Sequence, residues 1–352
     1  MKKAQAKPRI LFISWTARGN RPYYDPSVRY RCFNIAQELT RRGVQAEVIS
    51  QQNFERLHAD LGERDLYVFH RPYLNGFLAD FLAANQSRCI ADFDDLIFDV
   101  QYAEETPMVR VRGAPAISTR MYIAANAAAA AEFPRFTLST APLKSHVDRL
   151  FGGDAAIVHN AVDRGFIGLA RLIRQANPCQ HRPFRVGYFS GTATHDLDFR
   201  VALPGIIAMF ESSPSERMLL VGPLKLPPEL DVYRSRIVVK DLVPFHELSR
   251  EMAKCQMVMA PLERTIFNDS KSGLKFFEAA LVGCHVAATP IPDVDRFESP
   301  LLAKCTSEEE WISALSGAHS WSTDIDSAVA EVERTCSIEA TVDEWLEFAG
   351  IR

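Results

Sequence analysis

The feature that most constrains the fold is an alternation of short apolar runs with helical segments. Residues 9–15 (RILFISW) form a continuous apolar run, as expected for a strand covered on both faces, and a helical pattern follows up to Gly43. Further apolar runs lie at residues 45–50, 65–70, 88–93, 136–140 and 155–160. Strands that alternate with helices in this order form a parallel sheet with helices on both faces.

The same pattern restarts in the second half of the chain. Residues 170–184 are polar, contain two prolines and are predicted to be a linker. The apolar runs that follow lie at residues 184–191, 218–224, 236–240, 257–262 and 285–289. Because 352 residues are many for one hydrophobic core, two domains are expected. We predict an α/β protein with two Rossmann-like, doubly wound domains facing one cleft, divided into residues 1–168 and 169–332.

Composition and simple patterns exclude several classes of function. The formal net charge of −4 gives no reason to expect a nucleic-acid partner. The seven cysteines are scattered and none forms a CxxC pair, which favours reduced thiols in the cytosol over a zinc site. Neither GxGxxG nor GxxxxGK[ST] occurs, so a dinucleotide cofactor and a P-loop are not expected. No apolar run reaches the length of a membrane span, and we expect a cytoplasmic protein.

The segment FNDSKSGLKFFEAALVG, residues 267–283, combines features that suggest a ligand site. A helix is predicted from near Lys271, capped by Asp269 or Ser270, so Lys271 and Lys275 lie at its N-terminal end, where cations oppose the helix dipole. An anion bound there would explain the lysines, and Gly273 would allow it to approach closely.

Glu278 follows in the same predicted helix, inside the apolar run FFEAAL, and a carboxylate in an apolar setting normally needs a partner. A nucleoside diphosphate meets both needs, with phosphates at the lysines and ribose hydroxyls at Glu278. The alternative is a simple ion pair between Lys275 and Glu278 on a half-exposed helix. The segment alone leaves both interpretations open.

Other candidates lie in loops that follow predicted strands, where ligands of open parallel sheets bind. In the second half, residues 190–198 (SGTATHDLD) offer backbone N–H groups to an anion, and His195 is a weaker candidate. In the first half, Arg71, Asp94 and Asp95 follow predicted strands and are candidates for contact with a ligand. Arg29 and Arg31 lie just inside the first predicted helix, on the side where these loops gather, and could bind an anionic group. The alternatives are surface arginines and aspartates that cap the next element.

Six segments resemble, in the same order, the GT-B-fold glycosyltransferases, in particular retaining family 4 and its bacterial polysaccharide and lipopolysaccharide members. The likeness covers nearly the whole chain, and the last segment is the most specific. The segments are DPSVRYRCFNIAQELTRRGVQAEVIS, IADFDDLIF, IVHNAVD, RVGYFSGTATHDLDF, VPFHELSREMAKCQMVMAPL and NDSKSGLKFFEAALVGCHVAAT.

The resemblance implies roles for individual positions. Glu278 matches the second glutamate of the family's Glu-(seven residues)-Glu motif, which holds the ribose, whereas Ser270 stands where the first glutamate contacts the donor sugar. Gly191 and Thr192 match a turn that faces the diphosphate. Val243 and Pro244 match a loop that backs the base. A terminal helix, about residues 333–352, is expected to return to the first domain.

The implied activity is transfer of a hexosyl or deoxyhexosyl group from a nucleoside-diphosphate sugar to a glycan or lipid-linked acceptor in bacterial surface polysaccharide synthesis. The resemblance also implies that the first domain holds the acceptor, so Arg29, Arg31, Arg71 and Asp95 are expected to bind it and Asp94 is a candidate base. Lys271 and Lys275 would stabilise the leaving phosphate without a metal or cofactor, and retention of configuration would require no protein nucleophile. The alternatives are a sugar-nucleotide epimerase of the same fold and a non-catalytic nucleotide- or glycan-binding relative. The basic N-terminal tail suggests a weak peripheral contact at the inner face of the cell membrane.

Overall fold

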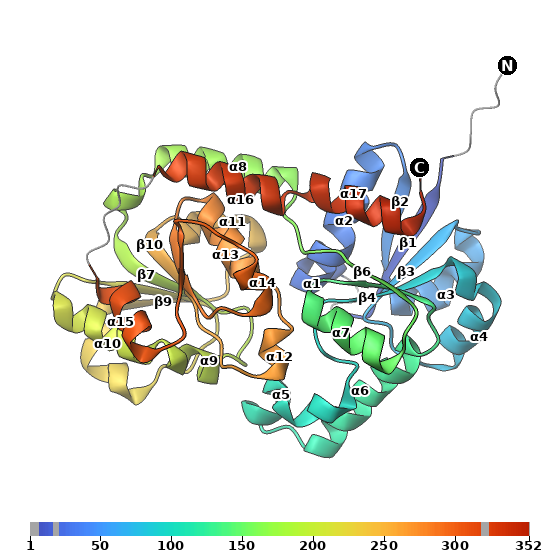
Figure 1. Cartoon of the computed structure of the whole chain (residues 1–352), viewed down its shortest axis with the longest axis horizontal. Coiled ribbons are helices and arrows are strands. Elements are labelled where there is room, and N and C mark those ends of the chain that lie inside the picture. Colours follow the sequence, from blue (N-terminus) through green and yellow to red (C-terminus); the bar gives the residue numbers. More distant parts are fainter. Residues whose placement is uncertain (1–6, 17–20, 318–323, 352) are drawn as a thin grey trace.

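The computed structural model describes residues 7–16, 21–317 and 324–351 and contains two parallel sheets side by side (Figure 1). The order of strands in the first sheet is β2-β1-β3-β4-β5-β6, and in the second it is β12-β11-β10-β7-β8-β9. The first sheet comprises β1 (Arg9–Ser14), β2 (Gln45–Ser50), β3 (Leu66–His70), β4 (Cys89–Phe93), β5 (Arg135–Leu138) and β6 (Asp154–Ile157). The second comprises β7 (Phe184–Phe189), β8 (Met218–Val221), β9 (Ile237–Lys240), β10 (Cys255–Ala260), β11 (His285–Ala288) and β12 (Leu302–Lys304).

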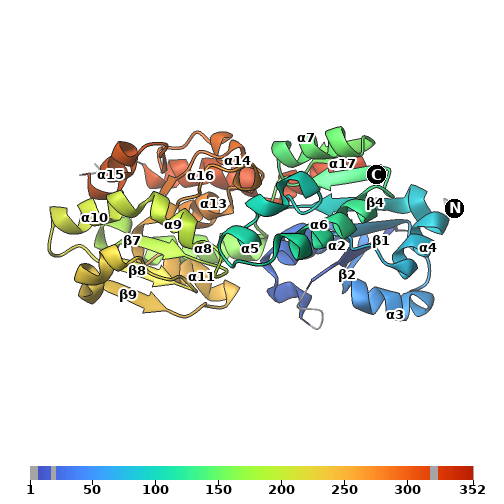
Figure 2. The same cartoon turned by 90° about the horizontal axis from the view of Figure 1, so that it is seen from below.

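Helices cover both faces of each sheet, as the alternation predicts (Figure 2). In the first domain they are α1 (Pro26–Val28), α2 (Asn34–Arg41), α3 (Gln51–Leu61), α4 (Gly76–Asn85), α5 (Pro107–Arg110), α6 (Ala116–Ala130) and α7 (Ala141–Leu150). In the second they are α8 (Arg164–Ala176), α9 (Asp196–Val201), α10 (Leu203–Ser212), α11 (Phe245–Met252), α12 (Ile266–Asp269), α13 (Leu274–Leu281), α14 (Pro292–Asp295), α15 (Glu308–Ser316) and α16 (Ile325–Cys336). The last helix is α17 (Ile338–Ala349).

Strand β1, which has a neighbouring strand on each side in the first sheet, shows why continuous apolar runs are required. In β1, Ile10 and Phe12 join the core that contains α2 and α17, while Leu11 and Ile13 join the opposite core with α3 and α4. Successive side chains of a strand point to opposite faces, so a strand buried on both sides must be apolar at every position. The second sheet follows the same rule on both faces of β7 and β10.

The chain crosses between the domains twice, and the two crossings are bonded to each other. The N–H of Val162 donates to the carbonyl of Cys336 (2.9 Å), and the N–H of Ile338 donates to the carbonyl of Val162 (3.1 Å). Helix α17 then packs on the first domain, where Trp345 lies 5.6 Å from Phe12 between ring centroids. The N- and C-terminal parts of the chain therefore meet on one domain (Figure 1).

Three details differ from the predictions. The predicted linker at 170–184 is wrong, because α8 runs through Ala176 with Phe166, Ile167 and Ala170 in the core of the second domain. The predicted division between residues 168 and 169 consequently falls inside a helix. Strand β12 lacks a long apolar run and was not predicted. The lipid contact was expected of the basic tail over the first nine residues, of which 1–6 lie outside the described residues, while Arg9 begins β1.

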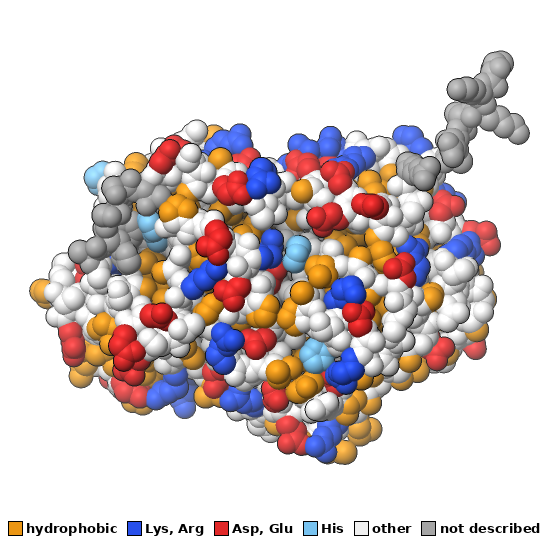
Figure 3. Space-filling view, in the orientation of Figure 1, with side chains coloured by type: hydrophobic (Ala, Val, Ile, Leu, Met, Phe, Trp, Pro, Cys, Tyr) orange, Lys and Arg blue, Asp and Glu red, His pale blue; other side chains and the backbone are white. Residues whose placement is uncertain are grey.

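The domains also touch away from the crossings. Arg110 in α5 forms a two-bond ion pair with Glu263 of the second domain (2.9 and 3.2 Å), and Phe267 packs into the core of the first domain. Positive and negative side chains are mixed over the face shown in Figure 3. None of the helices among the described residues has the length and apolar character needed to cross a lipid bilayer.

Candidate functional site

A cavity of about 240 Å³ lies between the two domains, at the carboxyl ends of β4, β7, β10 and β11. The first domain contributes Ser27, Asp94, Asp95 and Asn160 to its lining. From the second domain, the polar and glycine positions that line it include Gly191, His195, Lys271, Ser272, Gly273, Lys275 and Thr289. The position agrees with the general rule that parallel α/β sheets bind ligands beyond their strand ends.

The second-domain wall is built from the loop before α13 and the first turn of that helix. The helix begins at Leu274 with Gly273 as its N-cap, not near Lys271 as predicted. Asp269 ends the preceding helix α12, and Ser270 follows it, so neither residue caps α13. Lys271 therefore lies in a loop and Lys275 in the first helical turn, and both line the cavity.

Neither lysine has an ion pair within the described residues, and no bond between Lys275 and Glu278 is present there. The ammonium group of Lys271 lies 5.3 Å from the centroid of the Phe267 ring. The N–H groups at the start of α13 add partial positive charge, because the first residues of a helix lack intrahelical acceptors. This wall is thus electrostatically suited to a bound anion.

His195 faces the same space with a defined tautomer. Its Nδ1 lies 2.9 Å from the carboxylate of Asp198, so Nδ1 carries the proton and Nε2 is left as an acceptor. Burial lowers the pKa of His195, and the charges of Lys271 and Lys275 lower it further, although the Asp198 contact opposes them. The imidazole is accordingly neutral near pH 7 and suited to accept a hydrogen bond from a hydroxyl group.

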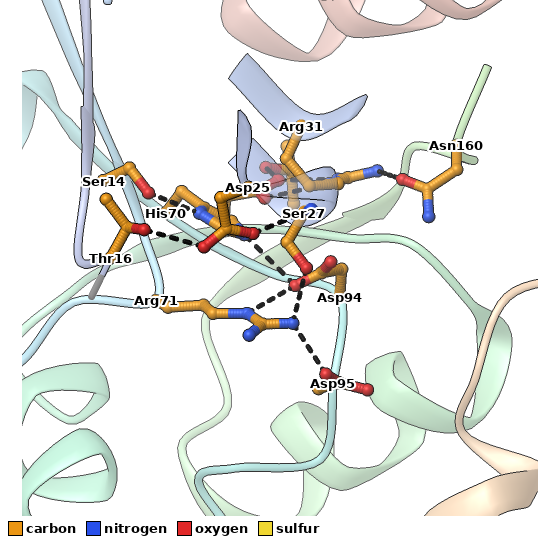
Figure 4. Close-up of polar contacts among 12 residues, drawn as sticks. Ser14, Thr16, Asp25, Ser27, Arg31, His70, Arg71, Asp94, Asp95 and Asn160 are labelled. Atoms are coloured by element: carbon orange, nitrogen blue, oxygen red, sulfur yellow. Dashed lines mark hydrogen bonds and ion pairs between the residues drawn. The ribbon is translucent and has the colours of Figure 1, made fainter. Parts of the chain in front are cut away.

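Around Asp94 and Asp95, the first-domain wall is a network of paired charges (Figure 4). Arg71 donates from Nε to Asp94 (2.7 Å) and from Nη2 to Asp95 (2.6 Å), and His70 contacts Asp94 at 3.1 Å. The Ser14 hydroxyl contacts the other ring nitrogen of His70 at 2.8 Å. Arg71 has a φ of 52°, a left-handed conformation that is rare for residues other than glycine and often occurs at functional sites.

The two aspartates of this network have different electrostatic environments. Burial alone would raise the pKa of Asp94, but the charge of Arg71 and the hydrogen bond from His70 lower it well below its usual range. Burial raises the pKa of Asp95, and Asp94 adds to this, whereas Arg71 and Lys271 oppose it. The Asp95 side chain is 29% exposed and that of Asp94 only 8%. Asp95 is therefore the more accessible and more basic of the pair.

Two predicted acceptor contacts are corrected by their burial. The side chain of Arg31 is completely enclosed and forms two bonds with Asp92, at 2.9 and 2.6 Å, together with bonds to Val158 and Asn160. Arg29 is also buried, with its guanidinium carbon 3.5 Å from the centroid of the Phe245 ring across the domain interface. Both arginines hold the structure together here, because neither leaves its charged group open to a ligand.

Glu278 is buried outside the cavity lining and contacts the first domain. The hydroxyl of Tyr30 donates to its carboxylate at 2.5 Å, and both residues are nearly inaccessible. Burial and the Glu278 carboxylate raise the pKa of Tyr30 well above its ordinary value. Tyr30 belongs to a short π-helical turn, Arg29–Phe33, a distortion that is frequent at functional sites. A ribose can bond to Glu278 only if the Tyr30–Glu278 hydrogen bond breaks, or if the carboxylate accepts from the ribose and from Tyr30 at the same time.

Of the remaining residues predicted to contact the donor, Gly191 lines the cavity and the others do not. Gly191 lines the cavity, whereas Thr192 is exposed and bonds to Thr194 at 2.7 Å. Ser270 is fully buried, and its carbonyl accepts a bond from Thr140 of the first domain (2.9 Å), so it does not reach the cavity. Val243 packs on the second-domain core and Pro244 precedes α11. Neither contributes to the cavity lining.

The sequence interpretation missed several residues of the site. Asp198 was detectable, because it follows His195 by three residues at the start of a helix. His70 and Ser14 gave no signal, since their partners lie 24 to 56 residues away in the chain. Asn160 lies in the resembling segment IVHNAVD but was given no role. No group of three or more metal-binding side chains occurs in the ranges that the structure covers.

Two facing Rossmann-like domains with the last helix returned to the first define a GT-B fold. Similar solved structures include HepE from Anabaena in complex with UDP and glucose (15% identity, 97% of this chain and 98% of that chain covered, TM-score 0.58). A glycosyltransferase from Rickettsia africae has 12% identity, 98% coverage of both chains and a TM-score of 0.61. WaaG, a glycosyltransferase involved in lipopolysaccharide biosynthesis, has 12% identity, 97% and 95% coverage and a TM-score of 0.57.

No protein-family model matches this chain, and no curated protein matches it by sequence. At identities of 9 to 15%, the likeness to the solved structures establishes the fold alone.

Proposed function

We propose that this protein is a glycosyltransferase that binds a nucleoside-diphosphate sugar in the cavity between its domains. The observation that carries the proposal is the pair of cations, Lys271 and Lys275, which line that cavity without an ion-pair partner among the described residues. A diphosphate supplies the missing negative charge at the start of α13. The UDP complexes among the similar structures make UDP the first nucleotide to test.

The lysines also suit the chemistry of transfer. Negative charge builds on the leaving phosphate as the bond to the sugar breaks, and cations held near that phosphate lower the barrier without a metal ion. We propose retention of configuration, in which the acceptor hydroxyl attacks from the side of the leaving group. No protein nucleophile is then needed.

We propose that the acceptor binds against the wall formed by Arg71, Asp94 and Asp95. Asp94 is the candidate for the base that the sequence indicates. However, its carboxylate already accepts hydrogen bonds from Arg71 and His70, and its pKa is lowered. Asp95, which is more exposed and has a raised pKa, is better suited to take a proton from an acceptor hydroxyl. Arg71 fixes both carboxylates and balances their charge.

The donor sugar cannot use the position of the family's first glutamate, because Ser270 is buried. His195 is the neighbouring group that can replace it, since its neutral Nε2 is an acceptor at the cavity. Glu278 keeps its proposed ribose contact if the domains open far enough to release Tyr30. We propose that the donor carries a hexosyl or deoxyhexosyl group and that His195 contacts this sugar in place of the motif glutamate.

For the wider role, we propose transfer to a glycan or a lipid-linked acceptor in the synthesis of a bacterial surface polysaccharide. The likeness to WaaG, which is involved in lipopolysaccharide biosynthesis, supports this class of acceptor. A cytoplasmic location with weak peripheral contact at the inner face of the membrane completes the proposal.

A thermal-shift screen with UDP, GDP, dTDP and CMP tests nucleotide binding, because a ligand that binds only the folded state raises the melting temperature. We expect one diphosphate to stabilise the protein. Lys271→Ala and Glu278→Ala are expected to reduce the shift. Lys144→Ala, which removes a lysine paired with Asp148 on α7, is the matched control and keeps the full shift. Equal shifts in all variants would reject this site.

Slow release of free sugar from a nucleotide sugar then separates an enzyme from a non-catalytic relative. An epimerase instead converts the nucleotide sugar to an isomer without any acceptor. Loss of Arg71 spares that conversion but abolishes transfer, because the acceptor wall serves transfer alone. Release of sugar by the parent protein, together with loss of transfer in Arg71→Met, is the expected result.

A further inference from the structure

Asp293 in α14 forms an unusually complete set of contacts beside the cavity. One oxygen of its carboxylate accepts the N–H of Gly273 at 2.6 Å and the hydroxyl of Ser272 at 3.0 Å. These two residues lie between Lys271 and Lys275 in the chain. The side chain of Asp293 is 1% exposed, and the residue does not line the cavity. It therefore acts on the loop and not on a ligand.

The other oxygen of Asp293 faces two cationic or donor groups. Arg296 of the same domain donates from Nε at 2.8 Å, and Nδ1 of His159 lies at 3.2 Å. His159 belongs to the first crossing between the domains, and its Nδ1 also lies 3.1 Å from the carbonyl of Ser139. Both neighbours of Nδ1 are acceptors, so this nitrogen carries the proton. Asp293 thereby links the lysine loop to the first domain.

The charge of Asp293 makes its position informative. Burial alone would raise its pKa, but the His159 hydrogen bond, the charge of Arg296 and the Gly273 N–H outweigh burial and lower the pKa of Asp293. The carboxylate is therefore ionised at neutral pH. A negative charge beside the N-terminus of α13 repels a phosphate, so electrostatics alone would disfavour Asp293 next to an anion site.

The packing explains why a carboxylate is nonetheless useful at this point. Gly273 lies close to α14: a Cβ added there would approach Val294 Cγ2 to 3.2 Å. The Gly273 N–H is the N-cap donor of α13 and needs an acceptor, since an unpaired buried N–H is costly. A single oxygen that accepts from both Ser272 and Gly273 fixes two adjacent residues of the loop, and this fixes the direction of the lysines on either side.

We propose that Asp293 is a positioning residue for the diphosphate site and that His159 makes this positioning depend on domain closure. The carboxylate holds the loop in the form that directs Lys271 and Lys275 into the cavity. His159 reaches the carboxylate only while the two domains are together. This inference rests on the proposed function, in which the lysines bind a nucleoside diphosphate.

The test is calorimetric titration of UDP and of inorganic pyrophosphate into the parent protein and into Asp293→Asn. The side chain of asparagine has one acceptor oxygen, so it cannot accept hydrogen bonds from the loop and also from Arg296 and His159. We expect both ligands to bind about tenfold more weakly, as follows from losing hydrogen bonds to a charged group. Charge removal alone predicts the opposite, tighter binding. Unchanged or tighter binding by Asp293→Asn overturns the inference.

His159→Phe tests the link to the first domain and serves if Asp293→Asn does not fold. It leaves Asp293 bonded to Arg296 and the loop, and we expect UDP to bind about threefold more weakly. In the double variant with Asp293→Asn, we expect no further loss, because both changes break one chain of contacts. Unaltered UDP affinity in His159→Phe, or fully additive losses, overturns the proposed link.

The two failures are distinguishable. If the parent protein binds neither UDP nor pyrophosphate, while other nucleoside diphosphates also fail, both the proposed function and the positioning role are overturned. If the parent binds and Asp293→Asn binds equally well, only the positioning role is lost. Melting temperatures of all variants are recorded without ligand, because a purely structural role lowers them and leaves affinity below the melting transition unchanged.

Discussion

The two walls of the interdomain cavity differ in whether their charged side chains form ion pairs. On the first-domain side, both arginines labelled in Figure 4 have carboxylate partners: Arg71 pairs with Asp94 and Asp95, and Arg31 pairs with Asp92. On the second-domain side, Lys271 and Lys275 line the cavity without an ion pair in the described part of the chain. One wall is electrostatically complete and the other is not.

This difference separates what a charge does for folding from what it does for binding. A buried charge with its partner in place supports the fold, and removing one member leaves the other exposed to a severe desolvation cost. A cation without a partner contributes nothing comparable to folding, but it is available to a ligand. Removing a member of a buried pair should therefore lower stability, whatever else it changes, whereas removing the unpaired lysines should change function without lowering stability.

The largest effect is expected from Arg31→Met. Among the described residues, the buried Asp92 carboxylate then keeps one hydrogen-bond donor, the Thr137 hydroxyl. The free energy of unfolding should therefore fall by about 3–5 kcal/mol. Urea denaturation measures the change. Arg120→Ala removes an exposed ion pair with Glu104 and should alter stability little. Equal losses in the two variants would contradict the structural role given to Arg31.

The double variant Lys271→Ala, Lys275→Ala removes both unpaired cations of the second-domain wall. We expect the rate of sugar transfer, measured as kcat/KM, to fall by about 100-fold or more, the usual scale when groups that stabilise developing negative charge are lost. The free energy of unfolding should stay the same or rise, because two cations that oppose the helix dipole are removed. A fall in stability that matches Arg31→Met would erase the contrast between the walls.

Tyr30→Phe tests the contact that joins the domains at Glu278. The buried carboxylate loses its 2.5 Å hydrogen bond, and we expect the free energy of unfolding to fall by about 1–3 kcal/mol. Tyr122→Phe, at a position 40% exposed, is the matched control. If Tyr30→Phe is as stable as the parent, the domains are not held together by this contact in solution.

Much of the fold was predictable, because a strand buried on both faces appears in the sequence as a continuous run of apolar residues. Residues 9–15 and 184–191 indicated β1 and β7 correctly within two residues, since each position must be apolar regardless of its neighbours. The linker prediction failed at α8, because a helix that buries only one side has no continuous apolar run. Its polar side and the nearby prolines dominate the composition of residues 170–184.

The site was predictable only where its residues are close in the chain. Lys271, Gly273 and Lys275 were identified together and do line the cavity. The start of α13 was misplaced, because Gly273 is bonded by Asp293, which lies 20 residues further along. Arg31 was likewise misjudged, since the group that buries it, Asp92, is 61 residues away. Contacts at such separations depend on the complete fold and leave no periodic pattern.

The smallest expected effect concerns His195, which lies in the second-domain wall of the cavity. Because the folded protein lowers the pKa of this histidine, the unfolded chain binds a proton more readily than the folded protein does. Stability from His195 is therefore complete above the unfolded pKa of about 6.5 and decreases as the pH falls below it. Replacement by asparagine removes this dependence. We expect the stability advantage of the parent over His195→Asn to shrink between pH 7.5 and pH 5.5.

Urea denaturation of both proteins at pH 7.5, 6.5 and 5.5 measures this difference, and the other histidines cancel because the two proteins share them. The range also avoids Asp198, whose pKa is lowered by the His195 bond and by Lys271 in spite of burial, so its contribution is lost only at more acidic pH. An advantage that grows as the pH falls would mean that Asp198 holds a charged imidazole. The lysines would then not dominate the potential at this position, and the contrast between the two walls would need revision.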